Sequence, residues 1–429
     1  MRERIAIIDG VRAPFGKAGG VLGSFGADDL GAIVVKELMA KTELRGEDVD
    51  ELIFGNVAQP VDAPNVGRVI ALKAGLPEGM PSYTVQRNCA SGMESITTAA
   101  NKIQAGEIDL AICGGTESMS NIPFLYRQEM VGIFAALFRA KSVMQKFKAL
   151  LRFRFRFLAP VIGVQKGLTD PVCEMNMGMT AELLARDFHI TREEQDAFAL
   201  ESHRKACEAM EGGLLDQETI PLPVMPKYQE IHYKDDGPRM DQSMDRLAKL
   251  RPYFDRHTGT VTVGNACPIT DGAVAVVVAS ESRAKELGYE PLGFLREYCY
   301  AGLDGKRMGL GPSYATAGLL DKSGLRLRDF DLVELNEAFA AQVIANERAF
   351  ASDRFAQEHL GRSKALGELE RDRLNVNGGS IALGHPVGAT GTRLVLTLLK
   401  ELRRRGENKG LATLCIGGGQ GAALALEVA

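Results

Sequence analysis

Hydrophobic and polar positions alternate along the first part of the chain in a pattern that predicts short buried strands separated by helices. From Arg4 to about Pro123, short apolar runs typical of strands recur between stretches with helical periodicity. Strands that alternate with helices build a mostly parallel sheet with crossover connections. In order, the pattern predicts a strand at 5–11, a helix at 28–40, a strand at 51–56, helices at 66–74 and 91–104, and a strand at 109–113.

The same rhythm returns after about Pro291 and predicts a second α/β half. Before it, residues 258–279 contain two β-type runs joined by a turn, which we expect to return the chain to the first sheet. The first half then comprises 1–123 and 251–284, and the second comprises 285–429. The expected elements of the second half lie at 292–300, 312–322, 331–335, 338–350, 375–378, 391–404 and 411–416.

Two segments, one from each half, repeat the same order of features. The segment 89–92 opens a helix followed by a strand that ends at Cys113, and the segment 388–391 opens a helix followed by a strand that ends at Cys415. From the final glycine of each segment to the cysteine is 21 residues in the first and 24 in the second. Such an internal duplication predicts two halves that pair across a pseudo-twofold axis. The equivalent helix N-termini would then meet in one place.

The stretch 124–250 differs in composition from both halves and is predicted to be an inserted loop domain. Within it, residues 130–169 carry eight basic side chains and no acidic one. Apolar residues from Met130 to Leu151 fall near helical spacing. This pattern indicates a basic amphipathic element at about 130–166 that suits a membrane or partner surface.

An alternative for this element remains open. Arg and Phe alternate from 152 to 157, and Phe153, Phe155 and Phe157 could pack beneath a loop while the arginines are merely solvated. Later in the chain, the highly charged stretch 351–373 is expected to be a solvated helical excursion.

Composition narrows the classes of function. A chain of 429 residues with 45% hydrophobic content is long enough for two or three domains. The net charge of −4 argues against a nucleic-acid footprint spread over the whole surface. The N-terminus leads directly into a strand-like run without a signal-peptide core, and no run of about 18 apolar residues is present. We therefore expect a cytoplasmic protein.

Seven cysteines are scattered along the chain without a Cys-x-x-Cys motif or paired histidines. Disulfide and zinc interpretations are both weak for such a pattern, so no metal is expected and the thiols should be reduced. Cys89 is a candidate nucleophile because it follows a short β run and precedes a helix with small residues in its first turn. The positive end of a helix dipole lowers the pKa of a thiol and favours the thiolate. A buried structural cysteine would give the same string.

His385 stands in a run of small residues, Gly384 to Gly391, at the start of the equivalent helix in the second half. A neutral imidazole near a thiol can take its proton and later donate a hydrogen bond to an oxyanion. We interpret the glycines as letting backbone and ligand approach closely. A purely structural histidine is the alternative.

Two strand ends supply further polar groups. Cys415 ends an apolar strand and precedes the glycines 417–419, whose N–H groups suit an oxyanion hole, although a glycine-rich hairpin would have the same sequence. Asn336 follows the strand at 331–335, at the end where open α/β sheets place ligands. A simple helix cap is the alternative there.

Four strings together resemble the thiolase family and occur in the family's order. The likeness covers essentially the whole chain. It implies the thiolase fold, an α/β fold of two duplicated βαβαβαββ halves in a five-layer αβαβα sandwich with an inserted loop domain. The strings are Asn88-Cys89-Ala90-Ser91-Gly92, Asn336-Glu337-Ala338-Phe339, Gly384-His385-Pro386 with Gly388-Ala389-Thr390-Gly391, and Cys415-Ile416-Gly417-Gly418-Gly419.

The resemblance also implies a role for each matching residue. Cys89 would be the nucleophile that becomes acylated, and His385 would activate it. With a water held by Asn336, His385 would also stabilise the charge on the thioester oxygen. Cys415 would exchange a proton with the acetyl-CoA carbanion or the CoA thiol. The N–H groups of Cys89 and Gly417 would form a second oxyanion hole.

Coenzyme A would then be a substrate, and no permanently bound cofactor is implied. By the same resemblance, Arg239 lies near the adenine end of CoA, and Met177 and Cys267 lie beside the pantetheine. Asn176 and Cys267 depart from the small biosynthetic members of the family, which often have His and Ser at these positions.

The basic insertion resembles the β subunits of fatty-acid oxidation trifunctional complexes, where this region contributes to membrane association. The resemblance favours a degradative thiolase that cleaves 3-ketoacyl-CoA in fatty-acid β-oxidation over an acetyl-CoA C-acetyltransferase. Asn336 departs from that branch, in which many members have His. Implied partners are acyl-CoA and CoA, a second copy in a homodimer or dimer of dimers, an α subunit, and a membrane contacted peripherally through Arg139 to Phe157. A non-catalytic acyl-CoA- or lipid-binding protein on the same scaffold is the remaining alternative.

Overall fold

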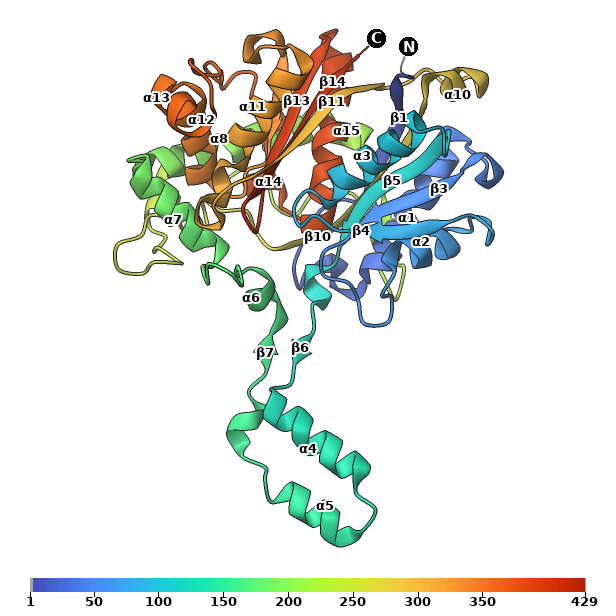
Figure 1. Ribbon diagram of the computed structural model, residues 1–429, viewed down its shortest axis with the longest axis vertical. Helices are drawn as coiled ribbons and strands as arrows, with labels where there is room; N and C mark the ends of the chain where they lie inside the picture. The colour runs from blue at the N-terminus through green and yellow to red at the C-terminus, as the bar shows by residue number, and fades with distance from the viewer. Residues whose placement is uncertain (1–2, 429) are drawn as a thin grey trace.

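A ten-stranded mixed sheet runs through the body of the protein, for which the computed structural model describes residues 3–428 (Figure 1). Its strands follow the order β12-β13-β14-β11-β1-β10-β5-β3-β4, and β2 pairs with β10 alone. The strands are β1 (Ile5–Arg12), β2 (Gly16–Lys17), β3 (Glu51–Gly55), β4 (Ser82–Val85), β5 (Leu110–Glu117), β10 (Thr270–Ser280), β11 (Gly293–Gly302), β12 (Leu332–Leu335), β13 (Lys409–Ile416) and β14 (Gln420–Glu427).

The sheet consists of two half-sheets with the same strand pairing. In the first, β10 lies between β1 and β5, followed by β3 and β4; in the second, β14 lies between β11 and β13, followed by β12. Leu374 forms a single parallel bridge to Val333, where the counterpart of β4 would lie, so the element expected at 375–378 is not a strand. The half-sheets join where β1 pairs antiparallel with β11, as at Ile5 and Leu295. The topology thus repeats the duplication seen in the sequence.

Helices form three layers around the two half-sheets. The first pair, α3 and α15, lies side by side between the half-sheets in one apolar core. The pair α1 and α2 covers the outer face of the first half-sheet, and α11 and α12 cover the second. This arrangement confirms the predicted αβαβα sandwich. The helices are α1 (Ala27–Thr42), α2 (Val66–Ala74), α3 (Ser91–Gln104), α10 (Glu281–Glu286), α11 (Gly311–Ser323), α12 (Ala340–Phe350), α13 (Asp353–His359), α14 (Ser380–Leu383) and α15 (Val387–Arg405).

Local sequence explains why the central elements form. Every residue of β10 is buried, in keeping with its nearly continuous run of Ala and Val between two paired neighbours. Helix α15 ends at Gly406, which adopts the left-handed conformation with a φ of 69°. Arginines 403–405 occupy its last turn, where positive charge complements the negative end of the helix dipole.

Two further local predictions are wrong. The first β-type run of 258–279 is not a strand, because the N–H groups of Thr260 and Val261 bond to the carboxylate of Glu182 and not to a neighbouring strand. The charged stretch 351–373 is helical only over α13.

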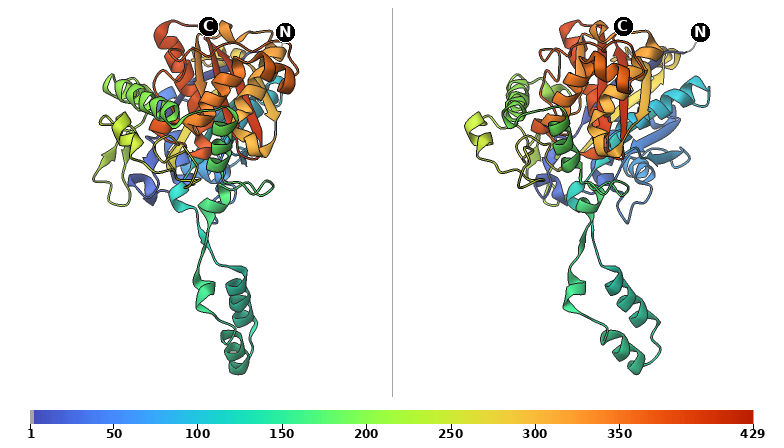
Figure 2. Two further views of the ribbon diagram at one scale, coloured as in Figure 1. Left: turned by 90° about the vertical axis from the view of Figure 1, so that its left-hand side faces the viewer. Right: turned by 60° about the vertical axis from the view of Figure 1, so that its left-hand side comes forward.

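The range 124–250 contributes two different structures. Helices α7 and α8 pack against the second half, and Leu184 and Phe198 belong to its core. A short ribbon of β6 and β7 instead carries α4 and α5 away from the body as an arm (Figures 1 and 2). The boundaries proposed for this domain stay a prediction. The elements are β6 (Phe124–Leu125), α4 (Gln128–Arg139), α5 (Val143–Leu150), β7 (Val161–Ile162), α6 (Gly163–Gly167), α7 (Met177–Asp187), α8 (Arg192–Glu211), β8 (Leu222–Pro223), β9 (Ile231–His232) and α9 (Met244–Ala248).

The arm exposes most of its apolar side chains. Helices α4 and α5 pack on each other, and their buried residues are Met130, Ile133 and Ala149. Phe138 is 93% exposed and Phe155 is 84% exposed, so Phe155 does not pack beneath a loop as the alternative required. Between residues 3 and 428, the structure holds no helix with the length and apolar content needed to cross a membrane.

Candidate active site

The N-termini of α3 and α15 meet at the centre of the molecule. A Cβ on Gly92 would lie 2.7 Å from the backbone nitrogen of Thr392, and one on Gly391 would lie 2.6 Å from that of Met93. A Cβ on Gly388 would likewise lie 2.6 Å from a carbonyl oxygen of β5. The close neighbours of these glycines are other atoms of the protein, mostly backbone atoms and, for Gly92, also the hydroxyl of Thr392. Their small size therefore serves the close approach of the two helices, as expected for the backbone, and their approach to a ligand stays a prediction.

Cys89 lies between β4 and α3 and remains partly exposed. The backbone N–H groups of Cys89 and Gly417 face its thiol and favour the thiolate. Burial acts in the opposite direction and is the larger effect, so the pKa of Cys89 is raised. The prediction that the helix N-terminus lowers the pKa of Cys89 is therefore wrong. A thiol that keeps its proton needs a base to become a nucleophile.

His385 has the form of a base, with an unprotonated ring nitrogen. Its Nδ1 lies 2.7 Å from the hydroxyl of Thr390, which itself donates to the carbonyl of Pro386 at 2.9 Å. Because a hydroxyl has one proton to give, Thr390 must accept from Nδ1–H, which leaves Nε2 unprotonated. This Nε2 is buried without a hydrogen-bond partner among the described residues. Burial, aided by the charge of Arg393, lowers the pKa of His385 to about 4, so the imidazole is neutral.

Three cysteines gather at this point. Cys415, at the end of β13, is 1% exposed; burial, then the neighbouring Cys89 and Cys267, raise its pKa well above the usual value. Burial, then Cys89, raises the pKa of Cys267 to about 12. Met177, at the start of α7, also belongs here, because a Cβ on Gly417 would lie 3.3 Å from its sulfur.

Gly417 opens the turn between β13 and β14, so the glycines do form a hairpin. Gly418 and Gly419 take positive φ values of 90° and 78°, which favour glycine. The side-chain amide of Asn88 donates to the carbonyl of Gly417 at 2.8 Å and holds this peptide in place. The hairpin and the N–H group directed at Cys89 are therefore features of the same turn.

Asn336 is fully buried directly after β12. The hydroxyl of Ser380 donates to its Oδ1 at 2.6 Å, and its Nδ2 has no partner among the described residues. Helix α12 begins only at Ala340, with Phe339 as its N-cap, so Asn336 is not a helix cap.

Sequence reasoning missed Glu117, which ends β5. Its carboxylate accepts hydrogen bonds from the N–H groups of Val57, Ala58 and Gly388, the last at 2.8 Å, and so anchors the start of α15. Burial raises the pKa of Glu117 to about 7, although these donors act to lower it. The sequence pattern ended the predicted strand at Cys113, before Glu117, and so did not single out this carboxylate.

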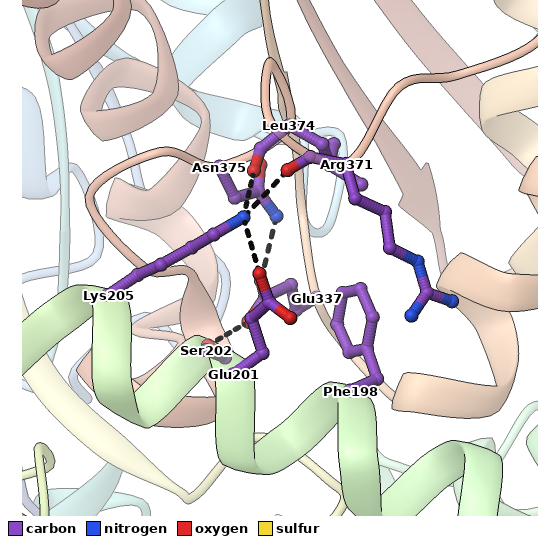
Figure 3. A pocket seen from close by; sticks show the side chains of 8 residues that line it. All are labelled: Phe198, Glu201, Ser202, Lys205, Glu337, Arg371, Leu374 and Asn375. Carbon is purple, nitrogen blue, oxygen red and sulfur yellow. Dashed lines mark hydrogen bonds and ion pairs between the residues drawn. The ribbon is translucent and has the colours of Figure 1, made fainter.

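A cavity of about 10 Å³ lies behind the site, between α8 and the segment 371–375 (Figure 3). It has room for about one water molecule and is not a substrate pocket. Glu337, which follows Asn336 in the chain, lines this cavity. It accepts hydrogen bonds from Ser202 and from Asn375, which lies in the segment before α14.

The structure does not bring every predicted residue to the cysteines. Arg239 is exposed, and its charge acts on His203, whose pKa is lowered to about 4 by burial and then by Arg239. Two residues before Arg239, Gly237 packs against the backbone of Ala382, so a Cβ on Gly237 would lie 1.9 Å from the carbonyl oxygen of Ala382.

Among residues 3–428, no three His, Cys, Asp or Glu side chains converge so as to hold a metal ion.

Comparison with known proteins places this arrangement in a family. Residues 5–282 match the model for the thiolase N-terminal domain, and residues 289–428 match that for the thiolase C-terminal domain. The chain belongs to the thiolase family. A 3-ketoacyl-CoA thiolase of Yersinia pestis is 44% identical over 427 residues, which cover 99% of this chain and 97% of that protein.

Solved thiolase structures superpose on the whole chain. The acetyl-CoA acetyltransferase of Bacillus anthracis is 37% identical, with a TM-score of 0.87 and coverage of 99% of both chains. Human mitochondrial 3-ketoacyl-CoA thiolase in complex with CoA is 35% identical, with a TM-score of 0.86 and coverage of 100% of this chain and 98% of that one. The predicted family and fold are thereby confirmed, and this thiolase is an acyltransferase.

Proposed function

We propose that this thiolase is an acetyl-CoA C-acyltransferase that cleaves 3-ketoacyl-CoA with CoA to acetyl-CoA and a shortened acyl-CoA, in fatty-acid β-oxidation. One observation carries the proposal: a neutral His385 and the thiols of Cys89 and Cys415 are positioned around the meeting point of two helix N-termini. The name of the Yersinia relative agrees with this substrate class.

In the first half-reaction, His385 Nε2 takes the proton of Cys89, and the sulfur attacks the 3-keto carbon. The bond between carbons 2 and 3 then breaks, the acyl group stays on Cys89 as a thioester, and acetyl-CoA leaves as an enolate. Cys415, whose raised pKa keeps it protonated, gives its proton to carbon 2.

In the second half-reaction, the Cys415 thiolate takes the proton of an incoming CoA thiol. The CoA sulfur attacks the thioester, Cys89 leaves as a thiolate and recovers its proton from His385, and the shortened acyl-CoA departs. Such a double displacement predicts ping-pong kinetics.

Two groups of donors would stabilise the oxyanions that form in these steps. The N–H groups of Cys89 and Gly417 face the sulfur where a thioester oxygen would lie, and each such donor is worth roughly 3 kcal/mol. His385 Nε2, once it carries the proton of Cys89, and a water held by Asn336 Nδ2 would serve the other oxygen; neither nitrogen has a partner among the described residues.

A series of 3-ketoacyl-CoA substrates of increasing chain length tests the proposal. We expect cleavage of substrates of C10 and longer, with acetoacetyl-CoA cleaved more slowly. Cleavage of acetoacetyl-CoA alone would instead support an acetyl-CoA C-acetyltransferase, the activity named for the Bacillus anthracis neighbour. Failure to cleave any member would leave a non-catalytic acyl-CoA-binding protein.

The same proposal extends to ligands and partners. Met177 and Cys267, which lie at the site, would contact the pantetheine, and the exposed Arg239 would contact the adenine end of CoA. We further propose a cytoplasmic homodimer or dimer of dimers, with an α subunit as a further partner. The exposed apolar and basic arm supports peripheral membrane contact through 139–157.

A further inference from the structure

We propose that one face of α15 positions both donors of the His385–Asn336 oxyanion site, with Arg393 and Ser380 acting as positioning residues for Asn336. This inference rests on the proposed function, because it explains how the site is held for the reaction described above. Thr390 already holds His385, and Arg393 lies three residues further along, on the same side of the helix.

The chain of contacts begins at a buried ion pair. Arg393 Nη1 lies 2.6 Å from the carboxylate of Glu334 in β12, and both side chains are almost completely buried. Arg393 Nη2 lies 3.4 Å from the hydroxyl oxygen of Ser380, which in turn lies 2.6 Å from Asn336 Oδ1. Arg393 is therefore connected to Asn336 through a single hydroxyl group.

The donor and acceptor roles in this chain follow from chemistry. A guanidinium group can only donate, so the Ser380 oxygen accepts from Arg393 and directs its own proton to an acceptor. That acceptor is Asn336 Oδ1, which turns the Nδ2 of Asn336 in the opposite direction. Nδ2 is a buried donor without a partner among the described residues, a state that costs free energy unless the site uses it.

The geometry also separates this role from simple stabilisation. Glu334, in β12, and Asn336, just after it, are two residues apart, and their side chains join the same cluster, Glu334 through Arg393 of α15 and Asn336 through Ser380 of α14. A buried ion pair by itself is weak evidence for stability, because the cost of burying charges offsets its attraction. Here the pair fixes a guanidinium group at a place where it sets the orientation of a group in the active site.

Replacement of Ser380 by Ala in the full-length protein tests the inference. We expect kcat for 3-ketoacyl-CoA cleavage to fall roughly tenfold with little change in KM, as for the loss of one hydrogen bond that acts in the transition state. Ser380→Cys keeps the shape with a weaker donor and should give an intermediate loss. The matched control is Ser313→Ala, since Ser313 also donates to a buried asparagine, Asn346, at 2.7 Å but outside the site.

A double-mutant cycle separates positioning from stability. In an Asn336→Ala background, Ser380→Ala should cause no further loss of kcat, because its effect passes through Asn336. An undiminished tenfold loss in that background would overturn the inference, as would a Ser380→Ala enzyme no slower than the Ser313→Ala control.

A crystal structure of Ser380→Ala gives a readout that does not need activity. The Asn336 side chain should turn relative to the parent protein, and an unchanged Asn336 would overturn the inference. If the parent protein cleaves no 3-ketoacyl-CoA, the proposed function fails. The crystal structure of Ser380→Ala then decides by itself whether Ser380 positions Asn336.

Discussion

His385 Nδ1 and Thr390 Oγ1 lie 2.7 Å apart, and this hydrogen bond determines which nitrogen of His385 accepts a proton. Replacement of Thr390 by Val keeps the shape of the side chain but removes the bond. The imidazole can then adopt the other tautomer, so we expect the rate of Cys89 acylation to fall roughly tenfold, as for about 1.4 kcal/mol of lost hydrogen bonding. Rapid-quench measurement of a single turnover checks this.

Thr392→Val is the control for this substitution. Thr392 is buried on the same helix, but its hydroxyl has no partner among the described residues, so its loss should leave acylation unchanged. Equal rates for Thr390→Val and the parent would show that the bond does not select the tautomer.

The thiol of Cys89 is predicted to carry the acyl group. Replacement of Cys89 by Ser should eliminate the acyl-enzyme and reduce turnover by at least roughly a thousandfold, since nucleophiles of this kind account for most of the rate. Intact-protein mass spectrometry after mixing with acyl-CoA should show the added mass for the parent and for Cys207→Ser, which lies outside the site on α8. An acyl adduct on Cys89→Ser, or substantial residual turnover, would refute the assignment.

Cys415 is predicted to move the proton at carbon 2 of acetyl-CoA. In Cys415→Ala, slow acylation of Cys89 should continue, but exchange of the acetyl protons with deuterium from solvent should stop. Proton NMR of acetyl-CoA in D₂O follows this exchange directly. Cys299→Ala on β11 is the control, and exchange at the parental rate in Cys415→Ala would assign the proton transfer to another group.

Burial of a neutral His385 should make the protein sensitive to acid. Its pKa is lowered to about 4 from the ordinary value of 6.5, so the unfolded state binds more protons between these values. Stability is therefore lost as the pH falls from about 6.5 to about 4, by up to roughly 3 kcal/mol. Replacement of His385 by Gln removes this contribution.

Apparent melting temperatures measured between pH 7.5 and pH 4.5 check this prediction. The decline on acidification should be shallower for His385→Gln than for the parent. Glu117, whose pKa is raised to about 7, acts in the opposite direction but is present in both proteins and cancels in the difference. Parallel curves for the two proteins would mean that His385 is not buried in its neutral form.

The arm is predicted to bind anionic membranes. Its basic side chains between 139 and 157 lie among exposed apolar residues, and each Lys or Arg near such a surface contributes about 1 kcal/mol. Sedimentation with liposomes that contain anionic lipid should show binding that weakens with salt, because screening reduces the attraction. Deletion of 139–157 should abolish it.

A variant with every Lys and Arg of that range changed to Gln separates charge from apolar contact. It should lose the salt-dependent part of the binding and keep the parental cleavage activity. Binding unaffected by salt and by the deletion would identify the arm as a protein interface or a packing element.

Much of this architecture is determined by sequence patterns that act over short distances. The strand predicted at 5–11 is β1 (Ile5–Arg12), and the helix predicted at 91–104 is α3, because hydrophobic periodicity follows directly from which side faces a core. The same pattern revealed the duplication, and with it the meeting of the segments that carry Cys89 and His385.

Tertiary structure alone decided the environment of those groups. The raised pKa of Cys89 depends on burial, which outweighs the N–H groups of the distant Gly417 and of Cys89 itself. The contacts of Asn336 with Ser380, and of Ser380 with Arg393, join residues that are 44 and 13 positions apart in the chain. No periodicity encodes such neighbours, since they depend on how α15 packs against β12. The sequence therefore determined which groups are candidates for the chemistry, and the packing decided their protonation and orientation.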